Sequence, residues 1–251
     1  MRYFLHLAYN GSNFHGWQIQ NNAITVQQVL NDALSLYFRT PIELNGAGRT
    51  DAGVHASDYY AHFELENPII DSEIPKIVYK LNGLLTNDVL IYNIFHVEDS
   101  AHARFDAISR TYKYYINTKK NIFNIDFSYT YYGRLDVEKM NEACKVLFAY
   151  TDFSCFSKSN TQTKTNNCKI MQANWEQIDN GLIFTITADR FLRNMVRAVV
   201  GTLMEIGKGN IEIEDIHKII ESKNRSKAGF SVPAKGLFLS NIEYPQGLLK
   251  K

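Results

Sequence analysis

Apolar and polar positions repeat with two different periods along the first hundred residues, and each change of period marks a new element. Strands, with apolar residues at every second position or in short β-forming runs, are predicted at 3–9, near 42–48, at 56–66 and at 89–97. Helices, with apolar residues three and four apart, are predicted at 25–38 and 71–85. Thr25 and Gln28 have the spacing of a capping box, which marks the first helix start. The order strand, helix, strand, strand, helix, strand is that of a ferredoxin-like unit.

The second half of the chain shows a similar succession of patterns. Strands are predicted at 109–118, 168–178, 181–188 and 237–244. Helices are predicted after Asp136 as an N-cap, at 191–206 and at 212–222. Asn180-Gly181 is a strong hairpin signal between two of the strands. We therefore predict an α+β fold of two ferredoxin-like halves, whose antiparallel sheets join around a central cleft.

We place the boundary so that an N-terminal α+β half spans 1–105 and a C-terminal α+β half spans 106–251, although no Pro- or Gly-rich linker marks it. The segment 157–168 is rich in Ser, Thr, Asn, Gln and Lys, and is predicted to be a mobile loop.

Composition narrows the class of protein. The chain has 251 residues, of which 45% are hydrophobic, enough for one large core or two smaller ones. The three cysteines have no metal-binding or redox spacing, which is typical of a reducing compartment. There is no signal-peptide pattern, and no apolar run approaches the ~20 residues that span a bilayer. We expect a cytoplasmic protein without a membrane partner and without a metal or small-molecule cofactor.

Charge gives only local hints of a polyanionic partner, because the net charge is +1. Between 101 and 120 there are five basic residues and one acidic residue, and the stretch 157–169 has Lys158, Lys164 and Lys169 with no acidic residue. Basic stretches of this kind are usually no more than solvated faces. An RNA-binding surface is the alternative interpretation.

The stretch 45–56 contains three glycines together with Arg49, Thr50, Asp51 and His55. Glycine allows positive φ and close approach of another chain, so the pattern is typical of an active-site loop. The alternative is an ordinary turn in which Asp51 caps its own backbone. The segment lacks the spacing of either nucleotide-binding glycine motif.

Two further segments carry candidate chemistry. Arg197 lies in a helix that is apolar on nearly every face, so its charge needs either a carboxylate partner, for which Asp51 is the candidate, or a path to solvent along its own stem. In 110–115, aromatic and basic residues are interleaved, and Tyr112 and Tyr114 share one face of a strand. That pattern suits base stacking, with plain sheet packing as the alternative.

Three segments together resemble a known family. The stretch 48–55 (Gly-Arg-Thr-Asp-Ala-Gly-Val-His) is similar to the signature of the TruA family of tRNA pseudouridine synthases. The stretch 191–204 resembles a second signature, and Arg-x-Tyr-x-Tyr at 110–114 a third. The segments 14–18 and 102–105 also match the family's pattern. We expect hydrogen bonds or RNA contacts from His15, His55 and His102, which have no metal-ligand spacing.

The resemblance implies a role for each candidate residue. Asp51 is expected to be the nucleophile, and Arg197 to contact it and keep it ionised. Arg49 is expected to take part in flipping the target nucleotide, and Tyr112 to pack on the extruded base. The resemblance further implies the pseudouridine synthase fold, isomerisation of uridine at positions 38–40 of the tRNA anticodon stem-loop, and a homodimer.

Two rival functions remain open from the residues alone. A non-catalytic RNA-binding protein with two RRM-like halves would show Lys/Arg-Gly-Phe/Tyr strands, and none is found. A hydrolase acting on a small glycoside would need a second carboxylate in a motif with Asp51, and none shares one.

Overall fold

The computed structural model of the chain describes residues 1–158 and 165–249 and divides it into two compact units. The first unit comprises Met1–Ile108 and Leu239–Lys251, and the second comprises Ser109–Phe238. The sequence-based boundary at 105/106 differs from this division in two ways. The change of unit falls after Ile108, and the end of the chain, expected in the second half, groups with the first unit.

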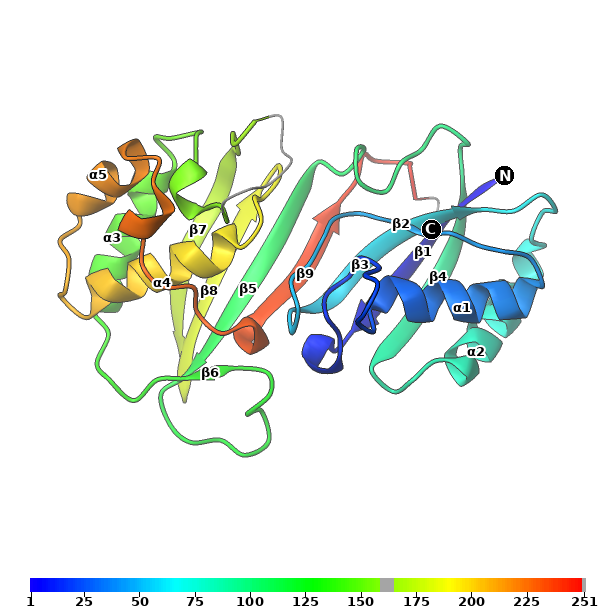
Figure 1. The fold of residues 1–251 in the computed structure, drawn as a ribbon, viewed down its shortest axis with the longest axis horizontal. Helices are drawn as coiled ribbons and strands as arrows, with labels where there is room; N and C mark the ends of the chain where they lie inside the picture. The colour runs from blue at the N-terminus through cyan, green and yellow to red at the C-terminus, as the bar shows by residue number, and fades with distance from the viewer. Residues whose placement is uncertain (159–164, 250–251) are drawn as a thin grey trace. The chain divides into compact units, whose positions relative to one another are not determined.

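The first unit follows the predicted βαββαβ order (Figure 1). Its elements are β1 (Arg2–Tyr9), α1 (Val26–Phe38), β2 (Asn45–Gly46), β3 (His55–Glu64), α2 (Ile74–Leu84) and β4 (Val89–Val97). Strand β1 is central and antiparallel to both β3 and β4, and β2 pairs with β3. The later residues of β9 (Leu237–Glu243) lie on the other side of β3 from β1. Helices α1 and α2 pack against each other, and α2 packs against β4.

The start of α1 is as predicted, because the Thr25 hydroxyl accepts the N–H of Gln28 at 3.4 Å. The strand predicted near 42–48 is shorter than expected, since only Asn45–Gly46 pairs with a neighbour. The backbone between α1 and β2 instead binds side chains of α1. The N–H of Ile42 donates to the Ser35 hydroxyl at 2.9 Å, and the N–H of Leu44 donates to the Asn31 side-chain oxygen at 3.1 Å.

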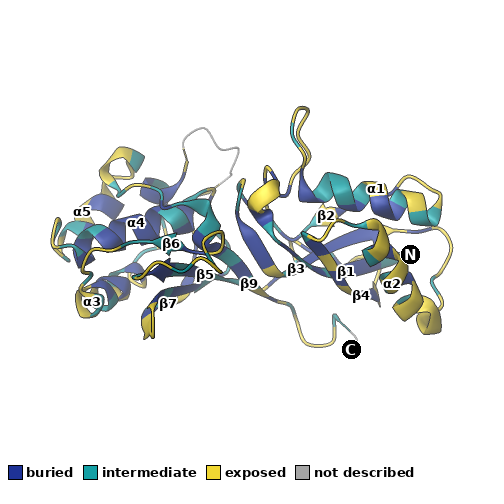
Figure 2. Cartoon of the chain, turned by 90° about the horizontal axis from the view of Figure 1, so that it is seen from below, coloured by how far each residue is buried: buried dark blue, intermediate teal, exposed yellow. Residues whose placement is uncertain are grey.

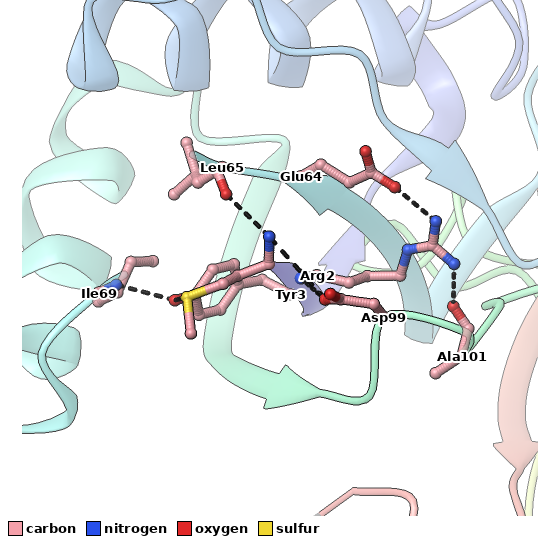
Figure 3. Close-up of polar contacts among 8 residues, drawn as sticks. Arg2, Tyr3, Glu64, Leu65, Ile69, Asp99 and Ala101 are labelled. Carbon is pink, nitrogen blue, oxygen red and sulfur yellow. Dashed lines mark hydrogen bonds and ion pairs between the residues drawn. The ribbon is translucent and has the colours of Figure 1, made fainter. Parts of the chain in front are cut away.

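The beginning of β1 is fixed by contacts with distant segments (Figure 3). The amino group of Met1 donates to the Leu65 carbonyl at 3.0 Å. Arg2 binds the carboxylate of Glu64 and donates to the Ala101 carbonyl at 2.7 Å, and the Tyr3 hydroxyl accepts the N–H of Ile69 at 2.8 Å. This end of the sheet is therefore held by polar contacts as well as by its apolar core.

The second unit repeats the order with additions. Its elements are β5 (Ser109–Asn117), β6 (Tyr129–Thr130), α3 (Val137–Leu147), β7 (Ile170–Ile178), β8 (Gly181–Ala188), α4 (Met195–Gly207) and α5 (Asp215–Glu221). The strands run in the order β5-β8-β7, antiparallel throughout, and β9 begins beside β5. The short β6 pairs parallel to β5 and was not predicted. Asp136 caps α3 as expected, accepting the N–H of Lys139 at 3.0 Å.

Helix α4 begins at Met195, four residues later than the predicted start at 191. Asn194 has a φ of 65°, a left-handed conformation that Asn tolerates and that interrupts the helical path. Figure 2 shows α4 buried along most of its length, whereas α1 and α3 each expose one side. The mixed α+β fold is thus confirmed. The loop predicted at 157–168 lies partly outside the described residues.

Among the residues that the structure describes, no helix combines the length and hydropathy needed to cross a membrane.

Candidate active site

The glycine-rich loop 47–54 connects β2 to β3 in the first unit. Its neighbouring side chains differ in exposure: Thr50 is buried, Asp51 is half-buried and Arg49 is exposed. The loop turns back at Gly53, which has a φ of 76°, and the N–H of Val54 donates to the Asp51 carbonyl at 3.2 Å. A non-glycine residue would be strained at this φ, so the turn that follows Asp51 depends on glycine.

The segment 14–17 holds the backbone of this loop from both sides of Asp51. The N–H of Trp17 donates to the Thr50 carbonyl at 3.3 Å, and the N–H of Gly53 donates to the Phe14 carbonyl at 3.2 Å. Gly16 between them has a φ of 88°, and a Cβ atom at this position would lie 2.4 Å from the Thr50 carbonyl oxygen. The family-like pattern noted at 14–18 therefore has a local physical reason: it is the support of the Asp51 loop.

Aromatic side chains contact the loop, and sequence reasoning did not single them out as candidate functional residues. The Tyr59 hydroxyl donates to the Gly48 carbonyl at 2.5 Å, and the Tyr9 hydroxyl lies 2.8 Å from the Thr50 hydroxyl oxygen. Trp17 packs against Tyr59 with ring centroids 4.2 Å apart. Strand tyrosines are usually core residues, and the only available signal was their position just before and just after the two family-like segments.

His55 and His102 make backbone contacts, as the sequence led us to expect. The imidazole Nδ1 of His55 accepts the N–H of Gly11 at 3.1 Å, and that of His102 accepts the N–H of Arg104 at 3.1 Å. Both contacts order a backbone turn.

Tyr112 lies on β5 in the second unit and is half-buried. Its ring makes an edge-on contact with Phe191, with centroids 5.1 Å apart. Arg110, two residues earlier, donates to the Asp189 carbonyl at 2.7 Å. Tyr114 is fully buried, as expected for a core residue, and donates its hydroxyl to the Pro233 carbonyl at 2.8 Å. Burial raises the pKa of Tyr114 above its usual value, although the nearby positive charge of Arg197 opposes the shift.

Arg197 lies in the first half of α4 and is half-buried, while its neighbours Val196 and Ala198 are buried. Its Nε donates to the Val232 carbonyl at 2.7 Å, and the N–H of Val232 donates to the Arg197 carbonyl at 3.2 Å. The guanidinium is thus oriented by a specific backbone partner. The alternative from the sequence is a side chain that only extends along its stem to solvent. The observed side chain also binds a defined backbone carbonyl. The pairing of Arg197 with Asp51 stays a prediction.

Known proteins resemble the chain over its whole length. A family model described as tRNA pseudouridine synthase matches residues 143–245. A tRNA pseudouridine synthase A of Parabacteroides distasonis is 56% identical over 98% of this chain and 97% of the relative. Proteins of the same description from Bacteroides fragilis and Clostridium acetobutylicum are 54% and 39% identical, over 99% and 96% of this chain and 98% of each relative. The chain belongs to the TruA family of tRNA pseudouridine synthases.

The basic stretches of this TruA family member differ in their surroundings. Arg104 is exposed and lies over the ring of Phe105, 5.7 Å from its centroid. Lys119 and Lys120 line a hollow of about 440 Å³ together with the exposed side chains of Ile122 and Phe123. Exposed aromatic and basic groups side by side suit contacts with RNA. Of the lysines noted in 157–169, Lys164 lies outside the described residues.

The burial of the three cysteines of this TruA family member indicates a structural role for their thiols. Cys144, Cys155 and Cys168 are all buried, and burial raises the pKa of each to about 12. Thiols with so high a pKa are poor nucleophiles at neutral pH. In the part of the chain that the structure describes, no three His, Cys, Asp or Glu side chains gather as a metal site.

Proposed function

We propose that the chain is an isomerase that converts uridine to pseudouridine in tRNA, with Asp51 as the catalytic carboxylate. The observation that carries the proposal is the 56% identity, over 98% of the chain, to a relative described as a tRNA pseudouridine synthase A. The local geometry supports Asp51, because this half-buried side chain lies in a loop whose backbone is anchored on both of its sides. An anchored loop pre-organises a reactive group.

The reaction is an isomerisation that needs a carboxylate and involves no net oxidation or reduction. The C1′–N1 glycosidic bond breaks, the uracil turns, and a C1′–C5 bond forms. The proton on C5 is lost and N1 gains one, so atoms and charge balance. Asp51 acts either by covalent attack on the nucleoside or by removing a ribose proton in a glycal route. Both routes use the same ionised group.

The other candidate residues act around this carboxylate. A uridine in a stem must leave the stack at a cost of a few kcal/mol, and we assign Arg49, exposed two residues before Asp51, to the flipping step. Tyr112 is assigned to hold the extruded base by stacking, and Arg197 to supply the positive charge that stabilises the ionised form of Asp51.

The finer details follow the family resemblance. We propose positions 38–40 of the anticodon stem-loop as the target, a homodimer as the active form, and the cytoplasm as the site of action. The alternative of a non-catalytic RNA-binding protein is not favoured, because relatives that match the whole chain are described as synthases.

Replacing Asp51 by Asn tests the proposal, because it removes the charge and keeps the shape. With tRNA that carries tritium on uridine C5, we expect Asp51→Asn to reduce tritium release on the order of 10⁴-fold, with tRNA binding in a filter assay changed by less than about threefold. Asp32→Asn, at an exposed carboxylate on α1, is the matched control and should behave as wild type. Release by Asp51→Asn near the wild-type rate would remove Asp51 from the chemistry, and wild-type protein that forms no pseudouridine would overturn the function.

The same assay distinguishes the roles of Arg49 and Tyr112. Arg49→Ala should slow turnover of a uridine in a closed stem more than that of an unpaired uridine, because only the former must be unstacked. Tyr112→Ala should slow both equally. The opposite pattern would show that these two roles are assigned the wrong way round.

A further inference from the structure

The residue directly before Asp51 makes an unusual side-chain contact with the central strand. The hydroxyl oxygens of Thr50 and Tyr9 are 2.8 Å apart, and the exposed fractions of these two residues are 8% and 4%. Tyr9 is the last residue of β1. The bond therefore links the catalytic loop to the strand at the centre of the first unit's sheet.

The partner of Thr50, Tyr9, is packed against other aromatic rings. The Tyr9 ring packs edge-on against Tyr59, with centroids 5.5 Å apart, and tilts against Trp17 at 6.2 Å. Trp17 in turn binds the Thr50 carbonyl through its N–H at 3.3 Å. Thr50 is thus held at both its side chain and its carbonyl, and the start of the next residue, Asp51, is fixed with it.

A tyrosine used only for packing would not need this hydroxyl, because phenylalanine fills the same volume. A buried hydroxyl that binds Thr50 has an effect that packing alone does not have. It fixes the backbone position from which the side chain of Asp51 extends. We propose that Tyr9 is a positioning residue, which acts through Thr50 to hold the Asp51 carboxylate in the geometry that reacts with uridine. This inference rests on the proposed function.

The test uses Tyr9→Phe, which removes the hydroxyl and keeps the ring. We expect kcat for tritium release to fall about tenfold while KM for tRNA changes less than twofold, since the change affects the placement of a reacting group and not tRNA binding. Thr50→Val should cause the same loss and Thr50→Ser should restore most of it. The double variant should be no slower than either single variant, because both single changes remove the same hydrogen bond.

Tyr3→Phe is the matched control, because it removes a buried hydroxyl from the same strand. The Tyr3 hydroxyl accepts the N–H of Ile69 at 2.8 Å, at the opposite end of β1 from Tyr9 (Figure 3). This variant should lose a comparable amount of thermal stability and keep its kcat. A wild-type kcat in Tyr9→Phe, or independent losses that multiply in the double variant, would overturn the proposal.

Amide hydrogen exchange separates this proposal from the proposed function, because it needs no turnover. Exchange of the amides in 48–54 should be faster in Tyr9→Phe than in Tyr3→Phe. Equal exchange in the two variants would overturn the positioning role, even if the wild-type protein forms pseudouridine. Faster exchange would support it as a local property of the loop, even if the substrate were wrongly assigned.

Discussion

The two units share one succession of strands and helices but differ at one connection, which joins β2 to β3 in the first unit and β7 to β8 in the second. In the second unit, β7 and β8 are joined by Asp179 and Asn180 alone, and Gly181 already belongs to β8. In the first unit, eight residues lie between β2 and β3, and they include Arg49 and Asp51. A two-residue hairpin satisfies this topology, so the longer loop is not required by the fold. The catalytic role that we propose for Asp51 accounts for the length and the glycines of this loop.

The supports of the two segments that carry Asp51 and Arg197 differ as well. The Asp51 loop is held by backbone bonds from the connection between β1 and α1. Arg197 is held by the helix that bears it and by the segment around Val232, which packs against this helix. The cover is tight, because a Cβ atom on Gly201 would lie 1.8 Å from the Phe230 carbonyl oxygen. Asp51 thus lies in a loop that is held by backbone hydrogen bonds, whereas Arg197 lies on a largely buried helix.

Among the residues that support the loop, the largest effect is expected at Gly16, whose backbone lies against the Thr50 carbonyl directly before Asp51. In Gly16→Ala the new methyl group would lie 2.4 Å from the Thr50 carbonyl oxygen, so the loop must move. A displacement of about 1 Å costs on the order of 100-fold in kcat. The left-handed conformation adds about 1–2 kcal/mol of destabilisation. Steady-state kinetics and thermal unfolding measure the two losses.

Gly209→Ala is the control for backbone strain in the second unit. Gly209 has a φ of 75°, and nothing lies within 4 Å of the added methyl group. This variant should lose about 1–2 kcal/mol of stability and keep its kcat. Equal kinetic losses at both glycines would show that strain alone, and not displacement of the loop, explains the result at Gly16.

A smaller loss of activity is expected when the charge on α4 is removed. Arg197→Met keeps most of the volume but removes the guanidinium, and a charge-assisted interaction is worth about 1.5–3 kcal/mol, so kcat should fall roughly 10- to 100-fold. Melting temperature should fall modestly, because methionine suits the apolar helix but removes the hydrogen bond to the Val232 carbonyl. Arg134→Met, at an exposed arginine of the same unit, should leave kcat unchanged. Wild-type kcat in Arg197→Met would contradict the proposed pairing with Asp51.

Sequence patterns predicted most elements because those elements are stabilised locally. The caps Thr25 and Asp136 and the hairpin at Asn180-Gly181 depend only on neighbouring residues, and each is found where expected. The two misplaced boundaries depend on distant partners. The strand near 42–48 is shortened by bonds to side chains of α1. Helix α4 begins only after the left-handed Asn194, whose side chain donates to the Ser231 hydroxyl at 2.6 Å.

The same distinction applies to the candidate site. Asp51 and Arg49 stand out in the sequence because glycines surround them. Tyr9 does not, since its contact with Thr50 spans forty-one positions and leaves no local pattern. Motifs thus reveal the proposed reacting groups, whereas the groups that hold them appear only in three dimensions.

The smallest effect is a dependence of stability on pH that distinguishes the two units. His62 lies in β3 and is buried, whereas the one histidine of the second unit, His217, is exposed. Burial lowers the pKa of His62 to about 4, helped by the positive charges of His102 and Arg2 and opposed by Glu64 and Asp106. The unfolded state therefore binds more protons between pH 6.5 and 4. The contribution of His62 to the free energy of unfolding is fully present above this range and is lost as the pH falls. The loss is about 1 kcal/mol between pH 7.5 and 5.5.

The two tryptophans allow each unit to be followed separately, because Trp17 lies in the first and Trp175 in the second. Urea unfolding in a Trp175→Phe background should show the loss at pH 5.5, and a Trp17→Phe background should show a smaller one. His62→Asn keeps an acceptor for the N–H of Ala103, which His62 binds at 3.2 Å, but cannot take up a proton. Its pH dependence should be shallower than that of wild type, although His102, whose pKa is also lowered by burial, still contributes. An unchanged slope in His62→Asn would show that His62 is not the source, and equal slopes from both tryptophans would show that the units unfold as one.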